Sequence, residues 1–194
     1  MDTLRIQTDD VLTPWPLADW FDNDHPIEVD LGCGKGRFLL AHAHDNPDIN
    51  FLGIDRMLRR IRKVDRKAVR AGLHNVRLFR MEAYYAVTYL IPAHSIATYY
   101  ILFPDPWPKA KHERHRLFNP AFMASLYRTL QPGGQVHVAT DHQPYFEAIT
   151  AVFAEHATQF VPQPAWAPAP HERTDFECLF INEKPIGRAT YRKT

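Results

Sequence analysis

The sequence predicts an α/β protein built on a doubly wound, mostly parallel sheet. Apolar runs of strand length alternate with helical stripes along residues 26–157, and the glycine-rich turn GCGKG separates the first run from the first stripe. Strands that alternate with helices pair in parallel through right-handed crossovers, because a crossover of the other hand does not pack back onto the sheet. We therefore expect one sheet with helices on both faces.

The first half of the chain is expected to contain three strands and three helices. The apolar runs place the strands at residues 26–31, 49–55 and 75–81. The helices are expected at residues 37–45, 57–71 and 83–90. The second helix has one apolar face and a stop at Gly72; that face carries Met57, Ile61, Val64, Ala68 and Ala71.

The second half continues the alternation. Strands are expected at residues 95–103 and, after the turn QPGG, at 135–140. Helices are expected at residues 120–130 and 144–157, and the second tolerates Pro144 in its first turn. The segment VPQPAWAPAP is interpreted as a proline-rich connector, and FECLFIN, residues 176–182, as a late strand.

Length and composition favour one domain over residues 1–194, with an acidic segment at 1–25 and a proline-rich connector at 162–175. The chain has 194 residues, 45% hydrophobic and 23% charged, which suits one sizeable core. It lacks an apolar run of the length of a membrane span and the basic start of a signal peptide. Two cysteines, Cys33 and Cys178, are too few for a disulfide framework. A cytoplasmic protein is expected.

Charge is distributed unevenly along the chain. The formal net charge is +1, yet residues 1–30 hold eight acids and one base, and residues 56–70 hold eight bases and one acid. Residues 109–116 add four bases against one acid. Two basic patches on a near-neutral chain indicate a local anionic partner. For residues 56–70 alone, a solvated helix face is the stronger interpretation.

Glycines and acids gather where the predicted strands end. Gly32, Gly34 and Gly36 follow the first strand and precede a helix, where glycine lets a ligand approach the backbone. Asp30, Asp55 and Glu82 lie at or near the ends of successive strands. A strand-to-helix turn alone would explain the glycines but not the acids. An acid after the second strand is placed to bind ribose hydroxyls.

Two cofactors compete for such a site. Dinucleotide sites usually show G-x-G-x-x-G around a pyrophosphate, whereas this turn is G-x-G-x-G. Asp30, two residues before the turn, would repel a pyrophosphate and attract an ammonium group. S-adenosylmethionine is therefore the expected cofactor, and NAD with an oxidoreductase activity is the alternative.

The segment ILFPDPWP places an aspartate in a stiffened loop after the fourth strand. Proline fixes its own φ and biases the preceding residue toward extended geometry, so Phe103, Asp105 and Trp107 all lose freedom. Ordered loops after strands are where α/β proteins keep their chemistry. Asp105 is therefore a candidate functional residue.

These motifs resemble known families. DLGCGKG resembles the first motif of class I S-adenosylmethionine-dependent methyltransferases. The segments FPDPWPKAKHERHR, ATDHQPY and TDFE resemble the tRNA (guanine-N7)-methyltransferase family, and the resemblance runs from about residue 25 to 181. It implies a seven-stranded, Rossmann-like class I methyltransferase fold that transfers a methyl group from S-adenosylmethionine to N7 of a guanine in the variable loop of tRNA.

The resemblance also assigns roles to residues. It implies that the cofactor is held by Asp30, Gly32, Gly34, Gly36, Asp55, Glu82 and Asp105, with Asp105 also catalytic. It implies that the substrate is bound by Lys109, Asp141, Thr174, Asp175, Phe176 and Glu177 within a substrate loop. RNA contacts are implied for Lys111, His112, Arg114, His115 and Arg116.

The expected chemistry needs no obligatory base, because guanine N7 has a free lone pair and no proton. Position and electrostatics should then carry the catalysis. Asp105 either stabilises the positive charge that develops on the guanine or orients the guanine by accepting hydrogen bonds. Trp107 either stacks on a base or plugs the loop from below.

Other interpretations remain open at this point. One is a class I methyltransferase that acts on a small molecule or a protein, and another is a non-catalytic RNA-binding protein of the same fold. No metal site is expected, because neither His42 with His44 nor His112 with His115 has supporting ligands at metal-site spacing. Monomer and homodimer are equally compatible with the sequence, and no membrane partner is expected.

Overall fold

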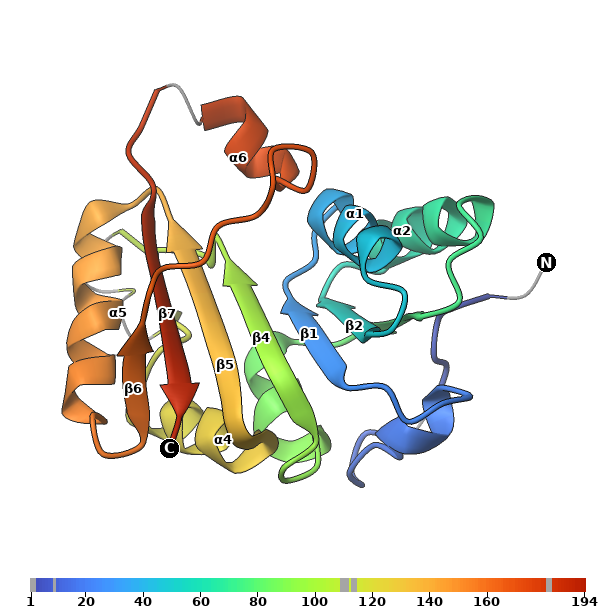
Figure 1. Ribbon diagram of the computed structural model, residues 1–194, viewed down its shortest axis with the longest axis horizontal. Helices are drawn as coiled ribbons and strands as arrows, with labels where there is room; N and C mark the ends of the chain where they lie inside the picture. Colours follow the sequence, from blue (N-terminus) through green and yellow to red (C-terminus); the bar gives the residue numbers. More distant parts are fainter. Residues whose placement is uncertain (1–2, 9, 109–111, 113–114, 181–182) are drawn as a thin grey trace.

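The strands of the protein form one twisted sheet (Figure 1). The computed structural model describes residues 3–8, 10–108, 112, 115–180 and 183–194. Within them, seven strands follow the order β3-β2-β1-β4-β5-β7-β6. The parallel strands are β1 (Ile27–Leu31), β2 (Asn50–Asp55), β3 (Val76–Arg80), β4 (Ile96–Leu102) and β5 (Leu130–Thr140). The antiparallel ones are β6 (Phe160–Gln163) and β7 (Gly187–Lys193). The predicted doubly wound, mostly parallel seven-stranded sheet is confirmed.

Helices cover both faces of this sheet. Phe51 and Leu52, adjacent in β2, belong to different buried clusters, so the clusters lie on opposite faces. One cluster includes side chains of α1 (Arg37–Asp45) and α2 (Leu58–Arg70). The other includes side chains of the π-helical turn η2 (Ala86–Leu90), which continues α3 (Ala83–Tyr85), and of α4 (Pro120–Thr129) and α5 (Gln143–Glu155). Among the described residues, no helix combines the length and apolar character needed to cross a membrane.

The strand order reverses between β1 and β4, which lie side by side although two strands separate them in sequence. Open α/β sheets bind ligands beside the carboxyl ends of their strands at such a switch point. The short helix α6 (Asp175–Phe180) stands over the carboxyl ends of β4 and β5 (Figure 1). The carboxyl edge of the sheet is therefore the candidate ligand-binding edge.

The N-terminal segment packs onto the outer edge of the sheet. Leu78 N–H donates to Leu4 O at 3.0 Å, and Ile6 N–H donates to Leu78 O at 2.9 Å, so this segment pairs with β3. The one-turn 3₁₀ helix η1 (Leu17–Trp20) follows, and the ring of Trp15 packs 4.4 Å from that of Phe79. The segment thus covers an edge strand that would otherwise expose unpaired backbone groups.

The strand expected at residues 176–182 is wrong, because the described part of this range lies in helix α6. Thr174 Oγ1 accepts the Glu177 N–H at 3.0 Å and so starts the helix. Phe176 and Phe180 pack on one helical face with ring centroids 4.7 Å apart. The last strand lies further on, at β7, and β6 occupies the start of the expected connector.

The other expected elements agree with the structure to within a few residues, with one difference at QPGG. This segment lies inside β5, where the pairing with β4 shifts between Ile96 and Thr98. Gly133 supplies the left-handed φ of 76° that the irregularity requires. The QPGG segment, which was predicted to be a turn, therefore forms an irregularity within β5.

Candidate functional site

The glycine turn joins β1 to α1 through residues with left-handed backbone geometry. Gly32, Gly34 and Gly36 have φ of 93°, 56° and 75°. A Cβ on Gly36 would lie 2.7 Å from Val64 Cγ1 in α2, whereas one on Gly32 would meet no described atom within 4 Å. The absence of a side chain at Gly36 lets α1 pack on α2, and the open space at Gly32 leaves the backbone accessible to a bound molecule.

Asp30 is a buried carboxyl group beside this turn, near the end of β1. The residue is 4% exposed. Burial, together with the negative charge of Asp55 on the neighbouring strand, raises the pKa of the Asp30 carboxyl to about 8. A bound cation would reverse this effect, because an opposite charge favours the ionised form.

Asp55 ends β2 and closes the glycine turn. Its Oδ2 accepts the Gly34 N–H at 3.1 Å and lies 3.2 Å from Arg60 Nη1, and its Oδ1 accepts the Met57 N–H at 2.7 Å. A carboxylate offers about four lone-pair positions, so three donors leave room for about one more. A second ligand hydroxyl would have to replace one of these partners.

Glu82 follows β3 and caps α3. Its two carboxylate oxygens accept the backbone N–H groups of Tyr84 at 2.9 Å and Tyr85 at 2.8 Å. This capping role is one that the strand-end pattern did not predict. The cap fixes the carboxylate at the carboxyl edge of the sheet, beside the following helix.

The loop that carries Asp105 is constrained in an unexpected way. The extended geometry expected before the prolines is wrong for Phe103 and Trp107, whose φ values are 56° and 43°. Non-glycine residues in this region carry strain of about 1–3 kcal/mol, which surrounding contacts must offset. Phe103 N–H donates to Ala139 O at 2.7 Å, which anchors the start of the loop to β5. Asp105 itself is exposed.

The basic stretch after the loop is described only in part. Lys109, Lys111 and Arg114 lie outside the described residues. Arg116 Nε donates to Pro106 O at 3.0 Å, and its guanidinium lies 5.2 Å from the ring centroid of Tyr145. This residue therefore braces the Asp105 loop as well as contributing a positive charge.

Trp107 packs with the two histidines that the resemblance assigns to RNA. Its ring centroid lies 5.8 Å from that of His112 and 5.1 Å from that of His115. The indole is half-buried and therefore neither a fully covered plug nor a free stacking surface. The three rings form one aromatic group beside the loop.

Helix α6 lies against the Asp105 loop. The ring centroids of Phe176 and Phe103 are 5.0 Å apart, which brings two segments that are distant in sequence together at one edge. Asp175 begins the helix, and Thr174 caps it. The predicted substrate loop is therefore adjacent to the predicted catalytic loop.

Glu177 is the buried member of α6, at 1% exposed. Its Oε1 accepts from Arg188 Nη2 at 2.5 Å and lies 3.5 Å from Arg173 Nε. Its Oε2 has no hydrogen-bond partner among the described residues. A buried acceptor without a donor costs about 1–3 kcal/mol, so this oxygen is suited to a donor brought by a ligand.

Asp141 directly follows β5 and faces the same region. Its Oδ2 lies 3.2 Å from Lys184 Nζ. Lys184 and Glu177 line one cleft of about 280 Å3, together with Arg173 and Arg188. Glu82 lines a different cleft of about 340 Å3 with Tyr84, His115 and Arg116. Of the predicted site residues, Glu177 lines the first cleft, and Glu82, His115 and Arg116 line the second. Asp30, Asp55 and Asp105 line neither of them.

A buried polar network ties the connector to the sheet, and sequence reasoning missed it. Glu172 Oε1 accepts from His42 Nδ1 at 2.6 Å, and His42 Nε2 lies 3.0 Å from the Tyr100 hydroxyl. Tyr100 in turn donates to Glu28 Oε2 at 2.8 Å. Glu172 Oε2 also accepts the Ala169 N–H at 2.9 Å. The contact between His42 and Glu172 spans 130 residues, and no local pattern announces it.

One group of acid and histidine side chains among the described residues has the compactness of a metal site. Ligand atoms of Asp45, His171 and Glu172 lie within 4.8 Å of one another. Two of these residues are exposed, and Glu172 is already held by His42 and Ala169. We assign no metal there.

Comparison with known proteins identifies the family. Residues 24–184 match the model of a protein family described as "Putative methyltransferase". The chain belongs to this family. Its glycine turn, strand-end acids and Asp105 loop all lie within the matched residues of this methyltransferase family.

Curated relatives of this methyltransferase carry a more specific name. A tRNA (guanine-N(7)-)-methyltransferase of Nocardia farcinica is 39% identical over 141 residues, which cover 73% of this chain and 52% of the relative. One of Streptococcus suis is 36% identical over 139 residues, or 72% of this chain and 65% of the relative. The matched region therefore spans between half and two thirds of these relatives.

Solved structures confirm the fold class. The 16S rRNA methyltransferase KamB superposes with a TM-score of 0.65 at 17% identity, over 90% of this chain and 89% of that one. At this identity the likeness shows the fold alone.

Proposed function

We propose that this methyltransferase transfers a methyl group from S-adenosylmethionine to N7 of a guanine in the variable loop of tRNA. The names of the relatives, which are 39% and 36% identical to this chain, support the reaction and the substrate class. The described parts of the motif segments that carry the resemblance follow β1, β4 and β5 or lie in α6.

The residues at the first two strand ends suit this cofactor. The pKa of Asp30, raised to about 8 by burial and by Asp55, leaves a buried carboxyl group that a bound ammonium would stabilise in its ionised form. Asp55 retains room for a ribose hydroxyl, and Gly32 leaves open space at the turn. Gly34, Gly36 and Glu82 complete the proposed binding set. When bound, the cofactor supplies an electrophilic methyl group on a sulfonium.

A single observation carries the substrate assignment: α6 packs on the Asp105 loop through Phe176 and Phe103, 5.0 Å apart. This contact places the unpartnered Oε2 of Glu177 in the helix adjacent to the loop that carries Asp105. We propose that Glu177 and Asp141 accept hydrogen bonds from the donor edge of the guanine, alongside Lys109, Thr174, Asp175 and Phe176.

Asp105 is the proposed catalytic residue. Guanine N7 attacks through its own lone pair, so the chain has no proton to remove before transfer. The base gains positive charge as the bond forms, and a constrained carboxylate nearby stabilises that charge without rearranging. The strain at Phe103 and Trp107 on either side limits where the carboxylate can move.

The basic segment beyond Asp105 is proposed to bind the tRNA backbone. His112, His115 and Arg116, with Lys111 and Arg114, would contact phosphates, which adds affinity without reading sequence. We further infer that residues 1–194 act as one domain, since the N-terminal segment pairs with β3.

The test is direct product mapping. The protein is incubated with radiolabelled S-adenosylmethionine and an unmodified tRNA transcript, and the RNA is digested to nucleosides. We expect label in 7-methylguanosine from the variable loop. Folded protein that binds the cofactor but yields no 7-methylguanosine would overturn the proposal.

A further inference from the structure

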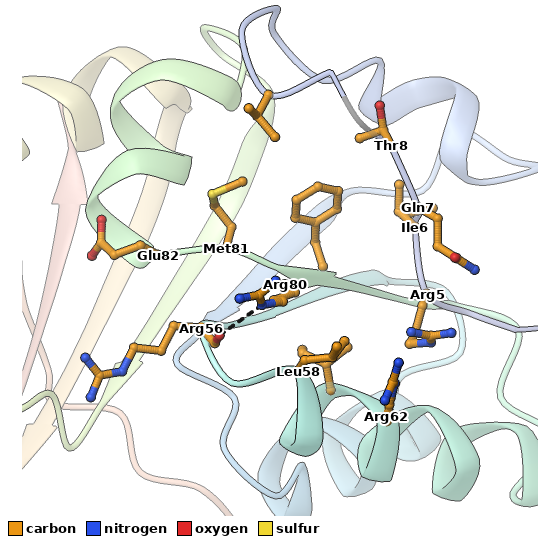
Figure 2. A pocket seen from close by; sticks show the side chains of 13 residues that line it. Arg5, Ile6, Gln7, Thr8, Arg56, Leu58, Arg62, Arg80, Met81 and Glu82 are labelled. Atoms are coloured by element: carbon orange, nitrogen blue, oxygen red, sulfur yellow. Dashed lines mark hydrogen bonds between the residues drawn. The ribbon is translucent and has the colours of Figure 1, made fainter.

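A cleft of about 760 Å3 lies between the N-terminal segment, α2 and the end of β3 (Figure 2). Its walls come from residues 5–8 and Val11, from Arg56 and the first turns of α2, and from residues 79–82. Of the residues to which the resemblance assigns a role, only Glu82 lines this cleft. The cleft is therefore additional to the substrate region around α6.

The lining of this cleft is strongly basic. Arg5, Arg56, Arg62 and Arg80 line it, against one acid, Glu82. Both oxygens of Glu82 accept backbone N–H groups of α3, and in the described part of the chain this carboxylate forms no ion pair with the four arginines.

The positive charges are poorly compensated. In the described part of the chain, no carboxylate forms an ion pair with Arg56, Arg62 or Arg80, and all three are exposed. Arg5 Nε lies 3.4 Å from Asp65 Oδ2 and makes no hydrogen bond. Figure 2 shows the side chains of Arg5 and Arg62 next to one another, although they come from different elements. Like charges held together repel, and a bound anion relieves the repulsion.

The position of the cleft indicates which anion it takes. Arg56 directly follows Asp55, and Glu82 lies on the border with the cleft that His115 and Arg116 line. The arginine-lined cleft therefore adjoins the cleft lined by His115 and Arg116, at the edge of the sheet where methyl transfer is proposed. A polyanion bound at the Asp105 loop would extend into the arginine-lined cleft. Guanidinium groups suit phosphates because they donate paired hydrogen bonds.

We propose that the cleft formed by Arg5, Arg62 and Arg80 binds backbone phosphates of the RNA substrate, outside the nucleotide that is methylated. This inference rests on the proposed tRNA methylation. It gives the N-terminal segment a role, since Arg5 is brought to the cleft by the pairing of that segment with β3.

The experiment compares two doubly substituted proteins. The test variant is Arg62→Glu with Arg80→Glu. The control is Arg70→Glu with Arg192→Glu, which makes the same charge change at two exposed arginines outside the cleft. Arg70 lies eight residues along α2 from Arg62, or about 12 Å along the helix axis. Affinity for an unmodified tRNA transcript is measured over a range of salt concentrations, and S-adenosylmethionine affinity is measured separately.

We expect the test variant to bind tRNA at least about tenfold more weakly than the control, with a salt slope reduced by about 1 to 2. Its affinity for S-adenosylmethionine should match that of the control. Equal tRNA affinities and slopes in the two variants would overturn the inference. Loss of cofactor affinity in the test variant would instead assign the cleft to the cofactor and also overturn it.

The wild-type protein separates the two proposals. If it methylates tRNA while the two variants bind alike, only the phosphate cleft is wrong. If it neither binds nor methylates tRNA, the proposed function is wrong and the cleft assignment with it.

Discussion

Glu172 and His42 meet at 2.6 Å in a contact that is nearly closed to solvent and ties the connector before α6 to helix α1. Their side chains are 9% and 12% exposed. Because α6 starts three residues after Glu172, this contact anchors the chain just before the helix that carries Glu177. We therefore propose that His42 and Glu172 are positioning residues for the proposed substrate-binding helix α6.

Glu172→Gln tests this positioning role. The substitution keeps the size of the side chain and removes the charge, so we expect a loss of about 1–3 kcal/mol in the free energy of unfolding. We also expect a higher KM for tRNA with little change in S-adenosylmethionine affinity. Steady-state kinetics and calorimetry measure these quantities, and Glu183→Gln, an exposed position, is the matched control. An unchanged KM for tRNA in the folded variant would contradict the positioning role.

Asp105→Ala is expected to lower kcat by about 100-fold to 1,000-fold, the range seen when a preorganised electrostatic group is removed. The fold should persist, because Asp105 is exposed. Single-turnover rates with saturating tRNA measure the effect, and Asp24→Ala, another exposed aspartate, is the control.

Asp105→Asn separates the two possible roles of this side chain. An asparagine keeps an acceptor oxygen and loses the charge. If the carboxylate stabilises charge, the rate falls as far as in Asp105→Ala. If it orients the guanine, most of the rate returns. Full activity in both variants would remove Asp105 from the mechanism.

The raised pKa of the Asp30 carboxyl predicts how the stability of the protein depends on pH. Its pKa is about 8 in the folded protein and about 3.8 in a model peptide, so the folded state alone holds the proton between these values. The contribution of Asp30 to the free energy of unfolding therefore falls as pH rises across this window, by up to about 1.4 kcal/mol per pH unit. Asp30→Asn should flatten this dependence in denaturant unfolding measured at several pH values. A parallel slope in wild type and variant would refute the assignment.

The same carboxyl group predicts the pH dependence of cofactor binding. A bound ammonium favours ionised Asp30, so S-adenosylmethionine affinity should increase as pH rises toward about 8. Asp30→Asn should bind more weakly and lose the increase. Calorimetry in buffers of different ionisation enthalpy checks this, because binding to wild type below pH 8 should release a proton.

The sequence was sufficient for the parts of the site that local patterns specify. Strand periodicity located Asp30 and Asp55, and glycine spacing located the turn, because each depends on a few neighbouring residues. The capping role of Glu82 needed the backbone of Tyr84 and Tyr85. Helix α6 was mistaken for a strand, since its alternating apolar residues fit both periods over so short a stretch.

Other features depend on contacts that sequence cannot list. His42 and Glu172 are 130 residues apart, and Phe103 and Phe176 meet only after the sheet has formed. The basic character of α2 was visible, but a solvated face was the stronger interpretation. Only the fold brings Arg5 and Arg80 beside Arg62 to line one cleft.

Gly36→Ala tests the packing beneath the glycine turn. The residue has a φ of 75°, and an added Cβ would lie 2.7 Å from Val64 Cγ1. Backbone strain and this clash together should cost about 2–4 kcal/mol of stability. Gly133→Ala is the matched control, because its φ is 76° and no described atom lies within 4 Å of an added Cβ. Chemical denaturation should show a smaller loss there, from backbone strain alone.

The clash between an alanine at position 36 and Val64 can also be removed by shortening Val64. Val64→Ala deletes both methyl groups that approach Gly36 and on its own costs stability through the cavity it leaves. In the double variant Gly36→Ala with Val64→Ala, the new methyl group partly fills that cavity. The double variant should therefore lose less stability than the sum of the two single-variant losses, with a coupling free energy of about 1 kcal/mol or more. Simple additivity would mean that α1 and α2 shift apart instead of holding their contact, and that strain at the turn accounts for the whole effect of the glycine.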